Sequence, residues 1–352
     1  MRLPLMTCGA ALLAGSVLAE TPHVVADITP VHSLVARVMQ GVGEPTLLVE
    51  PGASPHGYAL RPSQAAALNR ADAVFWIGEA LEPWLEGPLE TLGGKARQIE
   101  LMTVPGTTVL EYRLGAAFEK HDHGDDDDHG HYDAADDKHD HDDHDHDHDE
   151  HDHAEKDSHD HEGHDDHAKA ETDQHDDHDG HDHTGMDSHG WLDPMNAHVW
   201  LGAIAQELGR IDPENATRYA ANAAEGQAEL DELVAELNVQ LAAFRQVNFI
   251  VFHDAYQYFE NRFDLSAVGS ISLGDASEPG AARIAEIRNR VQELNVTCVF
   301  AEPQFNPGLI KAVSDGGVKV AEIDPLGTTL EVGPSLYPSL MRELANSISA
   351  CQ

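Results

Sequence analysis

Short apolar segments alternate with helical patterns on both sides of a long polar interruption, and this alternation restricts the fold more than any other feature of the sequence. Strands that alternate with helices indicate parallel βα units. We therefore expect an α/β fold in which two βα-repeat lobes are each built on a parallel sheet. The segments expected to form strands are His23–Ile28, Thr46–Val49, Ala73–Ile77, Asn248–Phe252, Thr297–Ala301 and Val318–Ile323.

A long helical pattern separates the two groups of strands. Its leucines recur at spacings of three and four from Leu230 to Leu241, and the pattern is nearly continuous over residues 213–245. At about 1.5 Å per residue, a helix of this length spans roughly 50 Å, more than a crossover connection usually needs. We predict that it braces two lobes. The expected organisation is an N-terminal lobe at residues 20–212, a linking helix at 213–246 and a C-terminal lobe at 247–352.

Shorter helices are marked by proline and aspartate. Asp193-Pro194 has the residues of an N-cap and a first helical position, and the helix that it opens should run to about Arg210. Proline also marks the expected starts of the other helices, except the last one, which follows Ser335. Those starts lie at or near Pro30, Pro62, Pro213, Pro279 and Pro307.

The polar interruption at residues 119–188 is an insert in the first lobe, rich in His, Asp and Glu. It carries 30 acidic and 4 basic residues, and the stretch from His121 to His183 holds 19 of the chain's 25 histidines. Its run HDDHDHDHDEHDH, residues 141–153, has no apolar face at the helical or the strand period. Low hydrophobicity and high charge predict disorder. The insert is either an inert acidic spacer or a segment that handles a cation.

The charge of the chain restricts the classes of partner that it can bind. The 352 residues carry a formal net charge of −42, and both the insert and the remainder are acidic. A nucleic-acid phosphate backbone is therefore an unsuitable partner. An acidic protein attracts metal cations.

The first 19 residues have the pattern of a signal peptide. Arg2 precedes a largely apolar stretch that ends in Val17-Leu18-Ala19, a small-residue cleavage site, and the stretch is too short for a membrane span. A lipid anchor on Cys8 is the weaker alternative, because little apolar sequence precedes it. Cys298 and Cys351 then remain, and two cysteines in an exported chain suggest a disulfide. Two free buried thiols are the alternative.

Six histidines lie outside the insert, and three of them lie in or beside loops near the ends of βα elements. His56 follows the second expected strand, His253 directly follows the fourth, and His189 precedes the Asp193 helix start. Asp324 directly follows the sixth strand. In open α/β sheets, ligands bind beyond the carboxyl ends of the strands. Three imidazoles and a carboxylate suit tetrahedral zinc. Each residue is otherwise an ordinary loop or capping residue, and we expect His198 to pack or lie on the surface.

Five segments carry a family resemblance: GASPHGYALRPSQ, HGWLDPMNA, FIVFHDAYQYFENRF, CVFAEPQFNP and EIDPLG. With them the chain resembles the zinc-specific solute-binding proteins of bacterial ABC importers, the ZnuA type, over the whole mature sequence. The resemblance implies two α/β lobes joined by a rigid helix, with zinc in the cleft between them. Carried over residue by residue, it implies the ligands His56, His189, His253 and Asp324. It also implies a disulfide between Cys298 and Cys351.

The resemblance further implies a periplasmic location, delivery of zinc to the membrane permease of an ABC importer, and no enzymatic activity. We expect the protein to be a monomer. Some relatives have a glutamate before the first histidine, where this chain has Pro55. The fourth ligand is then Asp324 or a water. Glu302 either supports a ligand or caps the next helix. In related manganese binders a glutamate replaces the third histidine, so His253 favours zinc.

Two other functions compete with zinc capture and delivery. A zinc hydrolase also uses three histidines and a water, but the chain has no HExxH motif, and HEGH at 161–164 is one residue short. A periplasmic metal buffer would explain the insert but would leave the two lobes without a purpose. We therefore predict a high-affinity zinc carrier whose insert gathers or buffers additional zinc at several weaker sites.

Overall fold

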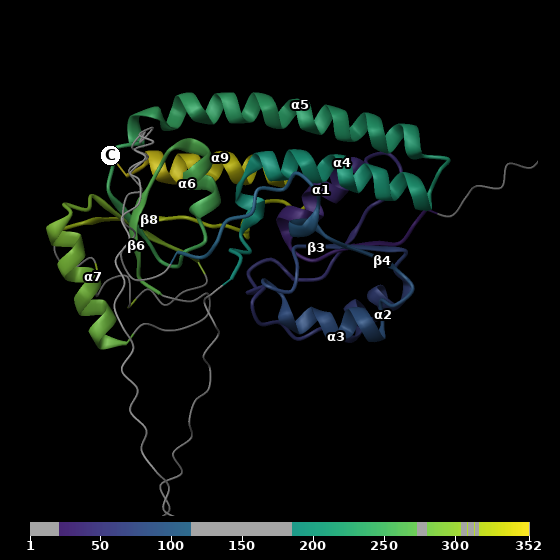
Figure 1. Ribbon diagram of the computed structural model, residues 1–352, viewed down its shortest axis with the longest axis horizontal. Coiled ribbons are helices and arrows are strands. Elements are labelled where there is room, and N and C mark those ends of the chain that lie inside the picture. Colours follow the sequence, from purple (N-terminus) through teal and green to yellow (C-terminus); the bar gives the residue numbers. More distant parts are fainter. Residues whose placement is uncertain are drawn as a thin grey trace, which may run out of the picture. The chain divides into compact units, whose positions relative to one another are not determined.

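Two parallel four-stranded sheets form the framework of the protein (Figure 1). The computed structural model describes residues 21–113, 185–272, 280–303, 308, 313 and 317–351. In the first sheet the strand order is β2-β1-β3-β4, and in the second it is β6-β5-β7-β8, so both follow the same connection pattern. Every neighbouring pair is parallel. The predicted two-lobed α/β fold is confirmed. The strands are β1 Val24–Ala26, β2 Thr46–Leu47, β3 Ala73–Trp76, β4 Arg97–Glu100, β5 Phe249–Val251, β6 Ala267–Ser270, β7 Cys298–Ala301 and β8 Lys319–Glu322.

Helices cover both faces of the first sheet. In Figure 1, α2 and α3 lie on one side of β3 and β4, and α4 lies on the other. Burial on both faces explains why β1 and β3 are apolar at every position, as parallel strands usually are. Asp193 caps α4 by accepting a 2.8 Å hydrogen bond from the backbone of Met195, as its sequence predicts. The helices of this lobe are α1 Thr29–Met39, α2 Pro62–Arg70, α3 Pro83–Thr91 and α4 Pro194–Ile211.

The second sheet is built in the same way. One of its faces packs a separate apolar cluster that joins Ile250 and Val299 to Ile287 and Val291 of α7. The other face joins the main core, in which Phe249 and Phe300 pack with α9. The helix expected near Pro307 falls largely outside the described residues. The helices described here are α6 Gln257–Phe263, α7 Ala281–Glu293 and α9 Leu336–Ser349.

The long helix α5, Ala216–Leu241, begins three residues after Pro213 and is followed by a 3₁₀ turn to Phe244. Its buried leucines are those with the predicted three-and-four spacing. Figure 1 shows α5 running along both α4 and α9. It also packs on α1. One helix therefore contacts elements of both lobes, which is the bracing role expected of it.

The lobes also meet directly. The indole of Trp191 donates to the carbonyl of Pro325 at 2.8 Å, and the Tyr337 hydroxyl donates to the carbonyl of Trp191 at 2.7 Å. Thr29 donates to the carbonyl of Leu326 at 2.5 Å. A single apolar core runs from β1 and α1 through α5 to α9. These contacts fix the ends of strands from both lobes beside each other.

Some features went beyond the sequence expectations, and some predictions lie outside the described residues. Strands β4 and β6 and helices α3 and α6 were not expected. Cys298 and Cys351 form the predicted disulfide. Among the described residues, no helix has the length and apolar character needed to cross a membrane. The predicted signal peptide at residues 1–19 and most of the insert lie outside the described residues.

Candidate metal centre

Three histidines from separate segments lie together where the two lobes meet. His56 comes from the loop after β2, His189 precedes the 3₁₀ turn Gly190–Leu192, and His253 lies two residues after β5. One ring nitrogen from each lies within 4.8 Å of the others. The ring centroids are 5.4 to 6.4 Å apart. Three nitrogens on a tetrahedral zinc at 2.0–2.1 Å would lie about 3.3 Å apart, so small movements would bring these three onto one ion.

His189 is buried and held by a carboxylate two residues before it. Its Nδ1 lies 2.8 Å from Oδ1 of Asp187, and the same oxygen accepts the His189 backbone N–H at 3.0 Å. Asp187 is completely buried. When Nδ1–H donates to the carboxylate, the tautomer leaves Nε2 as the ring's acceptor. The pair therefore presents a fixed ring with one nitrogen suited to a metal.

His253 has the same kind of support from the second lobe. Its Nδ1 lies 2.6 Å from Oε1 of Glu302, which directly follows β7 and is buried. The sequence left two roles open for Glu302, which were support of a ligand and capping of the next helix. The structure shows its contact with His253. Helix capping by Glu302 falls on residues outside the description. Two of the three histidines thus carry the carboxylate partner typical of zinc ligands.

His56 is half-buried in a loop that is anchored beside it. The Trp84 indole donates to the carbonyl of Pro55 at 2.6 Å. The ring of Tyr58 packs on Trp84 with centroids 5.5 Å apart, and its hydroxyl accepts from Gln64 at 2.9 Å. The residues on each side of His56 are therefore fixed by α2 and α3, so the loop holds its histidine against the other two.

The carboxylate of Asp324 is not among the grouped ligand atoms of the three histidines. Its two oxygens accept four hydrogen bonds from the turn that follows: Leu326 N at 2.9 Å, Gly327 N at 3.1 Å, and N and Oγ1 of Thr328 at 2.6 and 2.7 Å. Burial raises the pKa of Tyr256 well above its usual range, and the charges of Glu302 and Asp324 add to this rise. The charge of Asp324 therefore reaches Tyr256, whose ring lies 6.2 Å from that of His253, while its oxygens organise its own turn.

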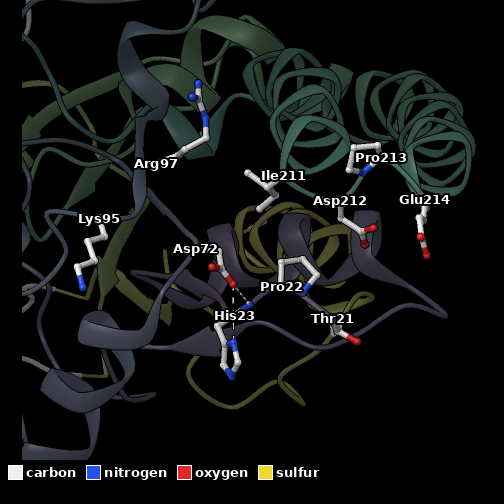
Figure 2. A pocket seen from close by; sticks show the side chains of 10 residues that line it. All are labelled: Thr21, Pro22, His23, Asp72, Lys95, Arg97, Ile211, Asp212, Pro213 and Glu214. Carbon is white, nitrogen blue, oxygen red and sulfur yellow. Dashed lines mark hydrogen bonds and ion pairs between the residues drawn. The ribbon is translucent and has the colours of Figure 1, made fainter. Parts of the chain in front are cut away.

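The other histidines outside the insert lie elsewhere. His32 contacts the carbonyl of Pro45 at 3.1 Å, and His198 is partly exposed, 3.8 Å from Asp231. His23 lines a hollow of about 660 Å³ at the opposite, amino-terminal edge of the first sheet, beside Asp72 (Figure 2). Within the described residues, the group of three or more His, Cys, Asp or Glu side chains that lie close enough together to hold one metal ion consists of His56, His189 and His253.

Comparisons with known proteins show the family of the chain. A family model described as zinc-uptake complex component A, periplasmic (ZnuA), matches residues 24–351. The chain belongs to this family. Its members are solute-binding proteins rather than enzymes, which confirms the predicted family and the prediction that the chain is not an enzyme.

Curated relatives match over nearly their whole length. The chain is 44% identical to the high-affinity zinc uptake system protein ZnuA of Brucella abortus (strain 2308), over 97% of this chain and 96% of the relative. It is 39% identical to the protein of the same name from Paracoccus denitrificans (strain Pd 1222), over 95% and 92% of the two chains. A crystal structure of ZnuA shares the fold with a TM-score of 0.66 at 23% identity, covering 94% of this chain and 100% of that one.

Sequence reasoning missed Asp187. Asp187 fell inside the insert as we bounded it, where Asp and His are so frequent that no single Asp stands out. The structure describes residues 185–188, and Asp187 and Ser188 are buried. A signal was present, because Met186 interrupts the polar tract two residues before Ser188.

Proposed function

We propose that this protein captures Zn²⁺ in the periplasm at His56, His189 and His253 and delivers it to the permease of an ABC-type importer. The observation that carries the proposal is the convergence of three imidazoles from both lobes, two of them held by buried carboxylates, in a chain of the zinc-uptake family. Imidazole is a preferred zinc ligand, and a carboxylate on its other nitrogen raises its basicity and fixes its orientation.

The donor set favours zinc over manganese. Harder ions such as Mn²⁺ prefer oxygen ligands, whereas three imidazole nitrogens suit Zn²⁺. The carboxylates of Asp187 and Glu302 contact the Nδ1 atoms of their histidines, where they support the ligands. The site therefore offers mainly nitrogen donors, and its negative charge lies behind them.

The fourth ligand in this proposal is Asp324 or a water. An ionised carboxylate has about four lone-pair sites, and Asp324 already accepts four hydrogen bonds from residues 326–328. Asp324 would have to release some of them to bind zinc. This cost favours a water in the fourth position.

Delivery requires export and a partner in the membrane. We propose that residues 1–19 direct export to the periplasm, that the protein is a monomer, and that its partner is the importer's permease. The relatives are named as parts of high-affinity zinc uptake systems, which supports this role. The domain organisation stays as proposed, with lobes at residues 20–212 and 247–352 and a linking helix at 213–246.

We also propose that the His-rich insert gathers zinc near the lobes or buffers an excess. Its HDH and HDDH repeats let two imidazoles from one extended segment reach the same ion. A segment without fixed geometry must lose conformational entropy when it binds. Its sites are therefore weaker than a preorganised cluster of three histidines, and zinc at them exchanges more readily.

The test is a zinc titration with a competing chelator on the mature protein and on His56→Ala, His189→Ala and His253→Ala. Each substitution removes a ligand, so affinity at the tight site should fall by at least 100-fold. His198→Ala is the matched control, because His198 is also described but lies outside the cluster, and it should bind as the wild type does. Unchanged affinity in any of the three ligand variants would remove that residue from the site.

Delivery is tested in cells. A strain that lacks this protein and any paralogue should grow poorly at low zinc and recover when zinc is added in excess. The wild-type gene should restore growth at low zinc, whereas the His253→Ala gene should not. Normal growth of the deletion strain at low zinc would contradict the importer role even if the purified protein bound zinc tightly.

A further inference from the structure

Arg113 links the two lobes directly beside the proposed zinc ligands. Its guanidinium donates to both oxygens of Asp254, the residue after His253, and to both oxygens of Glu260 in α6. The Nε atom lies 3.1 and 3.0 Å from the Asp254 oxygens, and the bonds to Glu260 are 2.8 and 2.9 Å long. Side-chain exposure is 16% for Arg113, 14% for Asp254 and 4% for Glu260. The three charges thus form a largely buried group.

The same segment is tied to His189. Residues 110–112 pair with residues 185–187: Asp187 N donates to the carbonyl of Leu110 at 2.8 Å, and Tyr112 N donates to the carbonyl of Gly185 at 3.0 Å. Asp187 in turn holds the His189 ring. Arg113 therefore ends a short strand pair whose other strand leads into a proposed ligand.

Helix α6 of the second lobe forms hydrogen bonds with this strand pair. The Tyr258 hydroxyl donates to the carbonyl of Asp187 at 2.7 Å and accepts the Leu110 N–H at 3.0 Å. The Gln257 amide, oriented with its nitrogen toward the two acceptors, donates to the carbonyl of Glu111 at 3.1 Å and to Oδ2 of Asp187 at 3.0 Å. Because α6 begins four residues after His253, it connects the support of His189 to the segment that carries His253.

We propose that Arg113 is a positioning residue for the zinc site, which holds the segments carrying His189 and His253 at the separation that one ion requires. This inference rests on the proposed zinc site. Arg113 acts through Asp254, Glu260 and the strand pair and does not touch the metal. A planar guanidinium can bind two carboxylates at once with fixed geometry, which a lysine ammonium cannot do.

Loss of the guanidinium would leave two carboxylates buried without their cation, which is strongly destabilising. We expect the surrounding segments to separate so that water reaches these charges. The two histidines would then lie at less suitable distances in the zinc-free protein. Zinc binding would have to restore the arrangement, so affinity should fall even though all three imidazoles remain. A tenfold loss corresponds to about 1.4 kcal/mol.

The test compares Arg113→Gln with Arg262→Gln. Arg262 forms the matched control, since it also belongs to a two-bond ion pair between the lobes, with Asp193 at 2.7 Å for both bonds. Zinc affinity is measured by chelator competition, and the visible spectrum of bound Co²⁺ reports the geometry of the ligands. We expect Arg113→Gln to weaken zinc binding at least tenfold and to shift the Co²⁺ bands, and Arg262→Gln to leave the spectrum unchanged.

Two further variants separate positioning from general stability. Arg113→Lys keeps the charge but not the planar fork, so it should not restore the wild-type spectrum. The pair Arg113→Gln with Asp254→Asn removes opposite charges together and should fold even if Arg113→Gln alone does not, yet still show weak binding. Wild-type affinity and spectrum in Arg113→Gln, or an equal change in Arg262→Gln, would overturn the inference. Failure of the wild-type protein to bind zinc tightly would instead overturn the proposed function.

Discussion

His253 and Glu302, which lie 49 residues apart in the sequence, meet in the second lobe at 2.6 Å between Nδ1 and Oε1. Both are 3% exposed. The pair has a counterpart in His189 and Asp187, at 2.8 Å. Each histidine ring is thus fixed by a carboxylate that water does not reach. A buried carboxylate needs a hydrogen-bond donor, so each pair stabilises the histidine tautomer that carries its proton on Nδ1. That tautomer leaves Nε2 available to a metal.

Glu302→Gln should weaken zinc binding by about 10- to 100-fold, the range found when such supporting carboxylates are changed. The amide keeps the size of the side chain but removes the charge that raises the basicity of the imidazole. Chelator competition measures the change. Glu322→Gln, an exposed substitution at the end of β8, serves as control and should bind as the wild type does. Equal affinity in Glu302→Gln and the wild type would show that the contact does not support a ligand.

Asp324→Asn should affect stability more than zinc affinity. The asparagine amide nitrogen cannot accept the hydrogen bonds that the carboxylate receives from residues 326–328, so the turn loses some of them, at about 1 kcal/mol each. Water as the fourth ligand would leave zinc binding within a few-fold of the wild type. Thermal unfolding and chelator competition on the same sample measure both effects. A loss of affinity of 100-fold or more would assign the fourth position to Asp324 itself.

The carboxyl ends of parallel strands explain how much of the site could be predicted. His56 and His253 follow strands that the apolar pattern identified, and in a parallel sheet such positions converge at one edge. Of the supports, Glu302 was found at a strand end by the same pattern, with two roles left open, whereas Arg113 and Asp187 could not be derived in this way. Arg113 and Asp187 lie beside a tract that hides them by its composition, and their role depends on a strand pairing across the insert. Glu302 contacts His253 only because β5 and β7 are neighbours.

In the fold as well, elements marked by a local sequence pattern could be predicted, whereas elements that depend on pairing with distant residues could not. Buried strands such as β3 are apolar throughout and were predicted. Edge strand β4, Arg97–Glu100, has two exposed and two half-buried residues and contains one apolar residue, so no periodic signal marks it. Its pairing with β3 supplies the reason for it to be a strand. Helix α6 has seven residues, too few to show a helical period.

Glu82→Gln should make stability less dependent on pH. Asp27 and Glu82 are both completely buried. Burial raises the pKa of Asp27 from its ordinary 3.8 to about 6, against the opposing effects of the neighbouring Glu82 carboxyl and of the backbone N–H groups of Ile28 and Ile77, which donate to Asp27. Burial also raises the pKa of Glu82, and the charge of Asp27 adds to this rise. Because the folded state holds these protons more tightly than the unfolded state, their contribution is fully present below pH ~4 and is lost as pH rises through the folded pKa values.

For Asp27 alone, a rise from 3.8 to about 6 corresponds to roughly 3 kcal/mol lost between pH 4 and pH 7. Glutamine keeps the size of the side chain but does not titrate, and it removes the charge that raises its neighbour's pKa. Urea unfolding at pH 5 and pH 8 should therefore show a smaller fall in the free energy of unfolding for Glu82→Gln than for the wild type. Exposed Glu90 supplies the control Glu90→Gln, which should leave the pH dependence unchanged. An equal or steeper fall in Glu82→Gln would contradict a contribution of the buried Glu82 proton to stability.

The disulfide should stabilise the fold without tuning the metal site. Cys298 begins β7 and Cys351 follows α9, so the bond closes a loop with a sequence separation of 53 residues. Loop-closure entropy gives about 4 kcal/mol for this length. Cys298→Ala with Cys351→Ala should lower the melting temperature by roughly 10 °C in a domain of this size. Cys298 lies at the opposite end of β7 from Glu302, so zinc affinity should stay within a few-fold. A parallel collapse of affinity would show that the second lobe depends on the bond to hold His253.

Removal of the insert should leave the tight zinc site intact. The segments that flank it are paired, because Tyr112 N donates to the carbonyl of Gly185 and Glu111 bridges Met186 in antiparallel fashion. Deletion of residues 121–183 therefore leaves both flanks long enough to join without moving Arg113 or Asp187. Calorimetry should show one tight zinc in the deletion protein and additional weak zinc in the intact one.

A version of the insert with its histidines changed to asparagine keeps length and acidity, and it should behave like the deletion if the imidazoles bind the extra zinc. Loss of the tight site in the deletion would place its ligands in the insert and contradict the assignment of His56, His189 and His253.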